Sequence, residues 1–290
     1  MRNSRVQISA KYLVFMASAR SVQCYGAQVW GFQQYALVEQ VLKYFVKRLF
    51  HLPRNTPDYF ISLETGVPPL FCHTLSLHFK YLLKVLGMPQ SRFPRVVAGE
   101  VVRRRLFWYR GIGRLAEQHR CTLGQSLESV ELWRSDFMLI MEKVEASWKE
   151  VAANRASASQ NRIYRLLDHD VRCIDMTAPE QKASMFVLRW VSRARGDLLR
   201  LNGRPHAPNT VDFTTDLCSL CNMGVPEDIM HFLAECPVLG EFRKANFGTA
   251  QLSHDVVIRM LNGLNWLPLA KFCKVAWAYR EELVSQFNWT

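Results

Sequence analysis

Four side chains that bind soft metal ions are concentrated in one short segment, CSLCNMGVPEDIMHFLAEC, at residues 218–236. Cys218 and Cys221 form a C-x2-C pair, nine residues separate this pair from His231, and four more separate His231 from Cys236. Two cysteines at this spacing can hold one ion from a tight turn, and a short helix after the turn can direct the other two side chains toward it. Three thiolates and one imidazole form a tetrahedral structural set for Zn2+, with no open position for a substrate. The spacing therefore predicts a structural zinc site.

Two other uses of these cysteines fit the sequence less well. A thioredoxin-like redox pair follows a strand and begins a helix in a βαβ unit, and the pattern around Cys218 does not. A disulfide framework is consistent with the even number of eight cysteines, but it requires an oxidising compartment. The cysteines outside the cluster are widely separated, and we expect them to be small buried hydrophobic residues: Cys24, Cys72, Cys121, Cys173 and Cys273.

The N-terminal segment MRNSRVQISAKYLVFMASAR has a basic start, an apolar stretch and small residues, as a signal peptide does. However, Lys11 interrupts the apolar stretch, and the same residues fit a helix with Ile8, Tyr12 and Phe15 on one face. No apolar run in the sequence approaches the length needed to span a bilayer. We therefore expect an intracellular protein, in the nucleus or the cytoplasm, without a membrane partner.

An excess of positive charge makes a polyanion the expected partner. The chain has 37 Lys and Arg against 25 Asp and Glu, which gives a formal net charge of +12. This charge favours binding to nucleic acid or to an anionic membrane surface. Of the two, we expect nucleic acid, either RNA or DNA.

Basic and aromatic residues are adjacent in RRRLFWYR, at residues 103–110, a composition that suits a nucleic-acid surface. The arginines can contact phosphates, and Trp108 can stack on an unpaired base. The segment RWVSRARGDLLR, at residues 189–200, and a basic helix face near residue 47 are further candidates. The residues predicted to contact nucleic acid are Lys47, Arg48, Arg103, Arg104, Arg105, Trp108, Arg110, Arg193 and Arg195. The alternative is that these segments are solvated helix faces whose aromatic residues lie in the core.

Hydrophobic periodicity predicts a mainly α-helical protein that positions these side chains. The expected helices cover residues 35–52, 69–87, 127–157, 178–203, 238–246, 253–264 and 268–288. Proline and glycine mark several of their ends, and the proline-containing segment 204–210 predicts a boundary before the cysteine cluster. The expected architecture is therefore a set of helices with a small zinc-stabilised knuckle near the C-terminal end.

The sequence has no motif that would support catalysis. It contains no Gly-rich phosphate loop, no nucleophile elbow and no pair of catalytic acids in a supporting context. His169 lies between Asp168 and Asp170, but this triplet is at an expected helix end, where a solvated cap is the simpler interpretation. We therefore expect neither enzymatic activity nor a small-molecule substrate.

Three segments resemble the reverse-transcriptase polyprotein of non-LTR retrotransposons. CSLCNMGVPEDIMHFLAECPVLGEFR, at residues 218–243, is similar to that family's C-terminal zinc knuckle, which has a Cys-Cys-His-Cys ligand set. CYGAQVWG, at residues 24–31, resembles the Tyr-Gly-x-x-x-Trp-Gly segment that follows the polymerase palm. FVKRLFHLPRNTPDYFISLETGVPPL, at residues 45–70, resembles the Leu-Pro-x-x-Thr-Pro stretch and the Glu-x-Gly after it. The order and separation of the three segments match the region downstream of the palm.

The resemblance implies a thumb-like helical region over 1–110, a helical connector over 111–205, a CCHC zinc-binding module over 206–248 and C-terminal helices over 249–290. Polymerase activity in the family needs an aromatic-x-Asp-Asp motif to hold two Mg2+ ions, and the sequence contains no Asp-Asp pair. The chain is therefore expected to be a zinc-binding, nucleic-acid-binding fragment or derivative that lacks the palm and the endonuclease. The alternative is a host-retained, zinc-dependent protein-interaction module that binds no nucleic acid.

Overall fold

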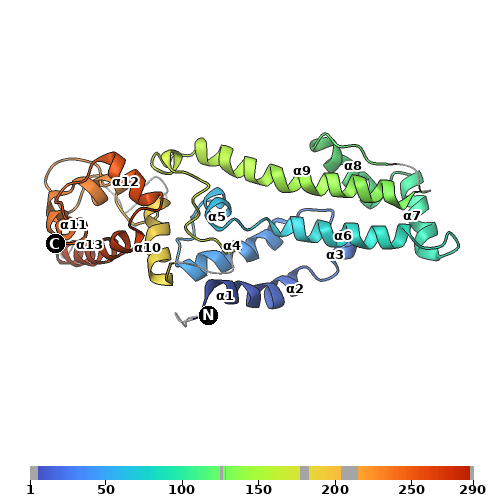
Figure 1. Ribbon diagram of the computed structural model, residues 1–290, viewed down its shortest axis with the longest axis horizontal. Helices are drawn as coiled ribbons and strands as arrows, with labels where there is room; N and C mark the ends of the chain where they lie inside the picture. Colours follow the sequence, from blue (N-terminus) through green and yellow to red (C-terminus); the bar gives the residue numbers. More distant parts are fainter. Residues whose placement is uncertain (1–5, 125–126, 128, 177–182, 204–214, 288–290) are drawn as a thin grey trace. The chain divides into compact units, whose positions relative to one another are not determined.

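Helices provide the regular structure of this chain (Figure 1). The computed structural model describes residues 6–124, 127, 129–176, 183–203 and 215–287. Among these residues, β pairing is limited to one isolated antiparallel bridge, between Leu217 and Pro226. The prediction of a mainly α-helical protein is therefore confirmed. None of the helices in the described part of the chain is long and apolar enough to cross a membrane.

The helices belong to two compact units, each assembled from segments that are distant in the sequence. Unit 1 combines residues 1–12, 45–67 and 152–290, and unit 2 combines residues 13–44 and 68–151. Three helices contribute residues to both units: α1 (Ile8–Phe15), α4 (Ala36–Phe50) and α9 (Val130–Ser157). The four-part division inferred from the sequence stays a prediction.

Unit 2 is built around an apolar core to which α6, α7, α8 and α9 contribute. The elements that lie wholly in this unit are η1 (Met16–Arg20), α2 (Ser21–Gln23), α3 (Ala27–Trp30), α6 (Leu70–Leu86), α7 (Phe93–Arg103) and α8 (Phe107–Gln118). In the core, the rings of Phe79 and Phe137 stack with centroids 4.1 Å apart. Burying one side chain of this kind contributes about 1.5–3 kcal/mol. Because the buried residues of this cluster all belong to unit 2, the unit has a core of its own.

Unit 1 contains the cysteine cluster. The elements that lie wholly in it are α5 (Asp58–Thr65), η2 (Tyr164–Leu166), α10 (Met185–Arg195), η3 (His231–Glu235), η4 (Pro237–Leu239), α11 (Gly240–Phe247), α12 (His254–Leu261) and α13 (Trp266–Phe287). Both α10 and α11 pack against α13. The cluster segment packs on the same helix, since the rings of Phe232 and Phe272 have centroids 5.7 Å apart.

One predicted helix, over residues 178–203, is much shorter in the structure, where α10 ends at Arg195. Asp197 has a φ of +49°, in the left-handed region, and a right-handed helix cannot continue through such a residue. Leu198 and Leu199 are then buried outside any helix. The other predicted helices match α4, α6, α9, α11, α12 and α13 to within a few residues. Residues 178–182 and the predicted boundary at 204–210 lie outside the described residues.

Candidate metal centre and basic surfaces

Cys218 and Cys221 belong to a tight turn that the backbone holds closed. Cys218 N donates a hydrogen bond to Val225 O at 2.9 Å. Gly224 turns the chain with a φ of +65°, a conformation that glycine adopts without steric cost. Leu220 N donates to Cys218 Sγ at 3.4 Å, so the turn also supplies a backbone donor to one sulfur atom. Both cysteine side chains therefore lie on the same side of the turn, as the spacing predicts.

His231 and Cys236 are aligned by the π-helical turn η3, where the sequence predicted only a short helix. Cys236 N donates to His231 O at 2.8 Å, across five positions. In an α-helix, with 3.6 residues per turn, side chains five positions apart lie about 140° apart around the axis. The wider i→i+5 turn brings them closer to one face, and such turns are frequent at functional sites. The π turn is therefore the local reason why a histidine and a cysteine at this spacing can share one ion.

The four predicted ligands converge on one point. Their ligand atoms all lie within 4.8 Å of one another, and Cys221 Sγ is 3.3 Å from His231 Nε2. Zn2+ with tetrahedral geometry and its usual bond lengths would place ligand atoms about 3.5–3.8 Å apart, so the donor set and the spacing fit such an ion. Cys221, His231 and Cys236 are buried, and Cys218 is half-buried. The predicted cluster is therefore confirmed as a group that could hold a metal ion.

The imidazole of His231 has a carboxylate beside its other nitrogen. Nδ1 of His231 lies 3.6 Å from Glu235 Oε2, and Glu235 Oε1 accepts a hydrogen bond from His254 Nε2 at 2.9 Å. The bond from His254 lowers the pKa of Glu235 below its ordinary value. A carboxylate behind a metal-binding imidazole fixes which ring nitrogen faces the ion. This arrangement supports Nε2 as the ligand atom. The contacts of Glu235 with His231 and His254 were not predicted from the sequence.

A buried guanidinium places positive charge close to the cluster. Three thiolates, a neutral imidazole and Zn2+ would carry a net charge of about −1, which a nearby cation stabilises. Arg243 is fully buried and donates to the carbonyl oxygens of Phe232, Cys236 and Ala250. Because two of these carbonyls belong to the segment of the π turn, Arg243 also holds the end of that turn.

The cysteines outside the cluster are mostly in the core. Cys24, Cys72, Cys173 and Cys273 are buried, which confirms that part of the prediction, and Cys121 is half-buried. Burial raises the pKa of the Cys72 and Cys273 thiols to about 12. Because the thiolate is the reactive form, these two thiols should react slowly.

We expect iodoacetamide at neutral pH to modify Cys121 in the zinc-loaded protein, and to reach Cys218, Cys221 and Cys236 only after a chelator is added. A metal-bound thiolate is protected, and removal of the ion frees all three sulfur atoms at once. Peptide mass spectrometry of the two samples measures the modification of each cysteine. Equal rates at the cluster cysteines with and without chelator would count against a metal centre.

All four arginines of unit 2 that were predicted to contact nucleic acid are exposed. Arg103, Arg104 and Arg105 are exposed at the end of α7 and just after it, and Arg110 is exposed on α8. Arg103 and Arg104 also form ion pairs with Glu100, at 2.6 and 2.9 Å. These exposed pairs contribute little to stability and leave the guanidiniums accessible to a phosphate.

In unit 1 the residues predicted to contact nucleic acid differ in how exposed they are. Arg48 is exposed, whereas Lys47 is half-buried and donates from Nζ to Arg54 O at 2.7 Å. Arg193 is half-buried, and its guanidinium donates to His51 O. Arg48 therefore has the most accessible charge of the three.

Trp108 and Arg195 are buried, and this corrects their assignment to a nucleic-acid surface. Trp108 is 7% exposed and packs in the core of unit 2, with its ring centroid 6.3 Å from that of Trp133. Arg195 is fully buried, with its Nη2 atom 2.9 Å from Oε1 of Glu64. Arg195 does not reach the surface, and Trp108 reaches it only where it lines a cavity of unit 2, so both are removed from the predicted set.

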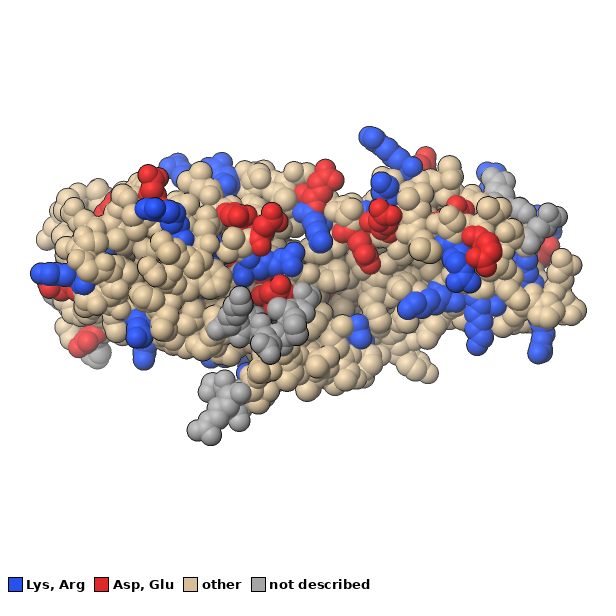
Figure 2. All heavy atoms as spheres, in the orientation of Figure 1, with Lys and Arg blue, Asp and Glu red and all other residues tan. Residues whose placement is uncertain are grey.

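Exposed aromatic residues in and near RRRLFWYR were not predicted from the sequence. Phe107 is 57% exposed and Phe93 is 78% exposed, although the neighbouring Trp108 is buried. With Tyr81, they line a largely apolar cavity of about 320 Å3 in unit 2. Figure 2 shows Lys and Arg side chains gathered over α6 and α7, the helices that carry Tyr81 and Phe93. The break between α7 and α8 sets which aromatic residue faces outward, and residue types alone do not show where that break falls.

Comparisons of the chain with protein-family models, with curated proteins and with solved structures found no match. The function is therefore inferred from the chemistry of the cysteine cluster and of the exposed basic residues. The three sequence segments that resemble a retrotransposon polyprotein add to that inference.

Proposed function

We propose that this chain is a zinc-binding and nucleic-acid-binding protein, derived from the region downstream of the palm in a non-LTR retrotransposon reverse transcriptase. In this proposal it has no polymerase or endonuclease activity of its own. The observation that carries the proposal is the convergence of Cys218, Cys221, His231 and Cys236, whose ligand atoms lie within 4.8 Å of one another. The resemblance of three sequence segments supports the family.

Zn2+ would act as a structural ion here, since four protein ligands leave no open position for water or substrate. In modules of this kind the free energy of metal binding is largely folding free energy, on the order of 10 kcal/mol. The residues of this chain then hold the segment in place. Phe232 packs on Phe272 of α13, and Leu252 N donates to Ala234 O at 3.3 Å.

The charge distribution of unit 2 supports a nucleic-acid partner. Between residues 80 and 120 the chain has ten Lys and Arg but only two Asp and Glu. The exposed basic residues of this segment are Lys80, Lys84, Arg92, Arg103, Arg104, Arg105, Arg110, Arg114 and Arg120. Such a density of exposed cations is expected to bind phosphates and to release counterions when it does so.

We expect the zinc-loaded protein to bind single-stranded RNA with an affinity that falls steeply as salt increases. Five phosphate contacts on a single strand would give a slope of about −3.5 in log K against log salt concentration. Replacing Arg103, Arg104 and Arg105 together by glutamine should make that slope shallower by about 2. Filter binding at several salt concentrations measures both quantities.

A matched control replaces Arg155, Arg162 and Arg165 by glutamine, because these arginines are exposed but lie outside the basic segment. The control removes the same charge and should leave the slope close to that of the unmodified protein. A protein that binds neither RNA nor DNA at low salt would favour the zinc-dependent protein-interaction module instead.

A further inference from the structure

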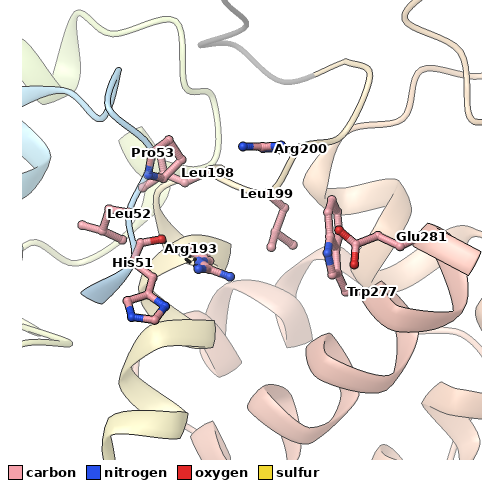
Figure 3. A pocket seen from close by; sticks show the side chains of 9 residues that line it. All are labelled: His51, Leu52, Pro53, Arg193, Leu198, Leu199, Arg200, Trp277 and Glu281. Carbon is pink, nitrogen blue, oxygen red and sulfur yellow. Dashed lines mark hydrogen bonds between the residues drawn. The ribbon is translucent and has the colours of Figure 1, made fainter. Parts of the chain in front are cut away.

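A polar cavity of about 290 Å3 lies within unit 1. Its lining includes Arg193 and Arg200, and also Trp277 and Glu281, which lie one turn apart on α13 (Figure 3). The volume is at the lower end of the range for small-ligand pockets. Guanidinium groups bind phosphate, and an indole ring stacks on a base, so the lining combines the two kinds of contact that a nucleotide makes.

Arg193 is held in position by its neighbours. Its Nε and Nη2 atoms donate to His51 O at 3.2 and 2.8 Å, and its guanidinium lies 5.5 Å from the centroid of the Trp190 ring. A guanidinium has five N–H donors, and this carbonyl engages two of them. Burial and the positive charges of Arg189 and Arg200 lower the pKa of Arg193, and the negative charge of Glu281 offsets part of that effect. The cavity therefore concentrates positive charge that an anionic ligand would stabilise.

Trp277 forms a wall that the cysteine segment holds in place. The Arg280 guanidinium lies 5.2 Å from the centroid of the Trp277 ring, and Phe232 meets that ring nearly edge-on with centroids 6.4 Å apart. Arg280 is itself buried and donates from Nε to Glu227 Oε1 at 2.7 Å. Phe232 and Glu227 both belong to the segment that carries the four ligands. Folding of the metal centre therefore preorganises one wall of the cavity.

We propose that this cavity binds one unpaired nucleotide of a single-stranded nucleic acid, with its phosphate on Arg193 and Arg200 and its base stacked on Trp277. The inference rests on the proposed nucleic-acid binding and deepens it by assigning a site. Glu281 is exposed, and its carboxylate can accept a hydrogen bond from a ligand that carries a donor. An amino group of a base, or a ribose hydroxyl, supplies that donor, whereas a bare phosphate would be repelled.

Fluorescence anisotropy tests the proposal with two labelled oligoadenylates, one RNA and one DNA. Each has about ten nucleotides, a length within the usual range of site sizes for single-strand binding. Trp277→Leu is expected to weaken binding by about 5- to 150-fold, the range that stacking of one base on an aromatic side chain supplies. Trp277→Phe keeps a flat ring and should retain most of the affinity. Arg200→Gln should weaken binding and reduce the salt slope by about 0.7.

Arg259→Gln is the matched control, because Arg259 is exposed on α12 and does not line the cavity. Unchanged binding by both Trp277→Leu and Arg200→Gln would overturn the assignment while leaving nucleic-acid binding intact. Equal losses in Arg200→Gln and Arg259→Gln would also overturn it, because net charge alone would then explain them. If Trp277→Leu does not fold, Arg200→Gln carries the test, since Arg200 is exposed.

The RNA and DNA arms distinguish the two sources of an unpaired nucleotide. Binding of either oligonucleotide that depends on Trp277 and Arg200 supports the cavity. If the unmodified protein binds neither, the proposed function itself fails, and that result is distinct from a failure of the cavity alone.

Discussion

Replacing Cys221 by serine is expected to abolish stoichiometric zinc binding and to unfold the segment 215–239, while unit 2 keeps its structure. The free energy of zinc binding in small modules, on the order of 10 kcal/mol, is largely the free energy of folding them. The regular structure described within this segment consists mainly of the Leu217–Pro226 bridge and short helical turns. Turns this short are not stable alone. Atomic absorption measures zinc per chain, and hydrogen exchange over the segment measures its unfolding.

Unit 2 provides an internal reference in the same experiment. Its core, which includes Leu75, Phe79 and Phe137, contains none of the four ligands, so its amides should exchange at the same rate in both proteins. Cys121→Ser is the matched control, because Cys121 is half-buried and lies outside the cluster. That variant should keep its zinc. Equal zinc content in Cys221→Ser and the unmodified protein, or unchanged exchange after chelation, would show that these side chains do not form a metal centre.

The sequence predicted all four candidate ligands because their placement is a local matter. A tight turn sets the direction of Cys218 and Cys221, and a short helical segment sets that of His231 and Cys236. What surrounds the ligands depends on tertiary contacts and was missed. His254 reaches Glu235 from 19 positions away, and only the folded arrangement of α12 shows that contact.

Periodicity also predicted where most helices lie, but it did not show which charged or aromatic side chains face inward. In RRRLFWYR both Phe107 and Trp108 are aromatic, and the fold buries the second while exposing the first. In RWVSRARGDLLR, Arg195 is buried in an ion pair with Glu64, which lies 131 positions earlier in the chain. A partner at that separation leaves no signal in the local pattern.

The buried ion pair between Arg195 and Glu64 is expected to make a large contribution to the free energy of unfolding. Replacing Arg195 by methionine should lower the free energy of unfolding by about 3–5 kcal/mol. Nε of Arg195 lies 3.0 and 3.1 Å from the two carboxylate oxygens of Glu64, and its Nη atoms donate to Val171 O and Leu261 O. Methionine has a comparable length, but it leaves the buried Glu64 carboxylate without its counter-charge and these carbonyls without their donor. Urea denaturation followed by circular dichroism measures the loss.

Adding Glu64→Gln to Arg195→Met separates the cost of an unpaired charge from the cost of altered packing. A glutamine at this position carries no charge and can still accept a hydrogen bond from Tyr164 OH, which lies 3.1 Å from Glu64 Oε1. The double variant should therefore recover at least half of the lost stability, and additive losses would place the cost in packing. Arg162→Met, at an exposed arginine, should change stability by about 0.5 kcal/mol or less.

Because Arg195 does not reach the surface, folded Arg195→Met should bind RNA with the unmodified salt slope, and a shallower slope would return Arg195 to the nucleic-acid surface.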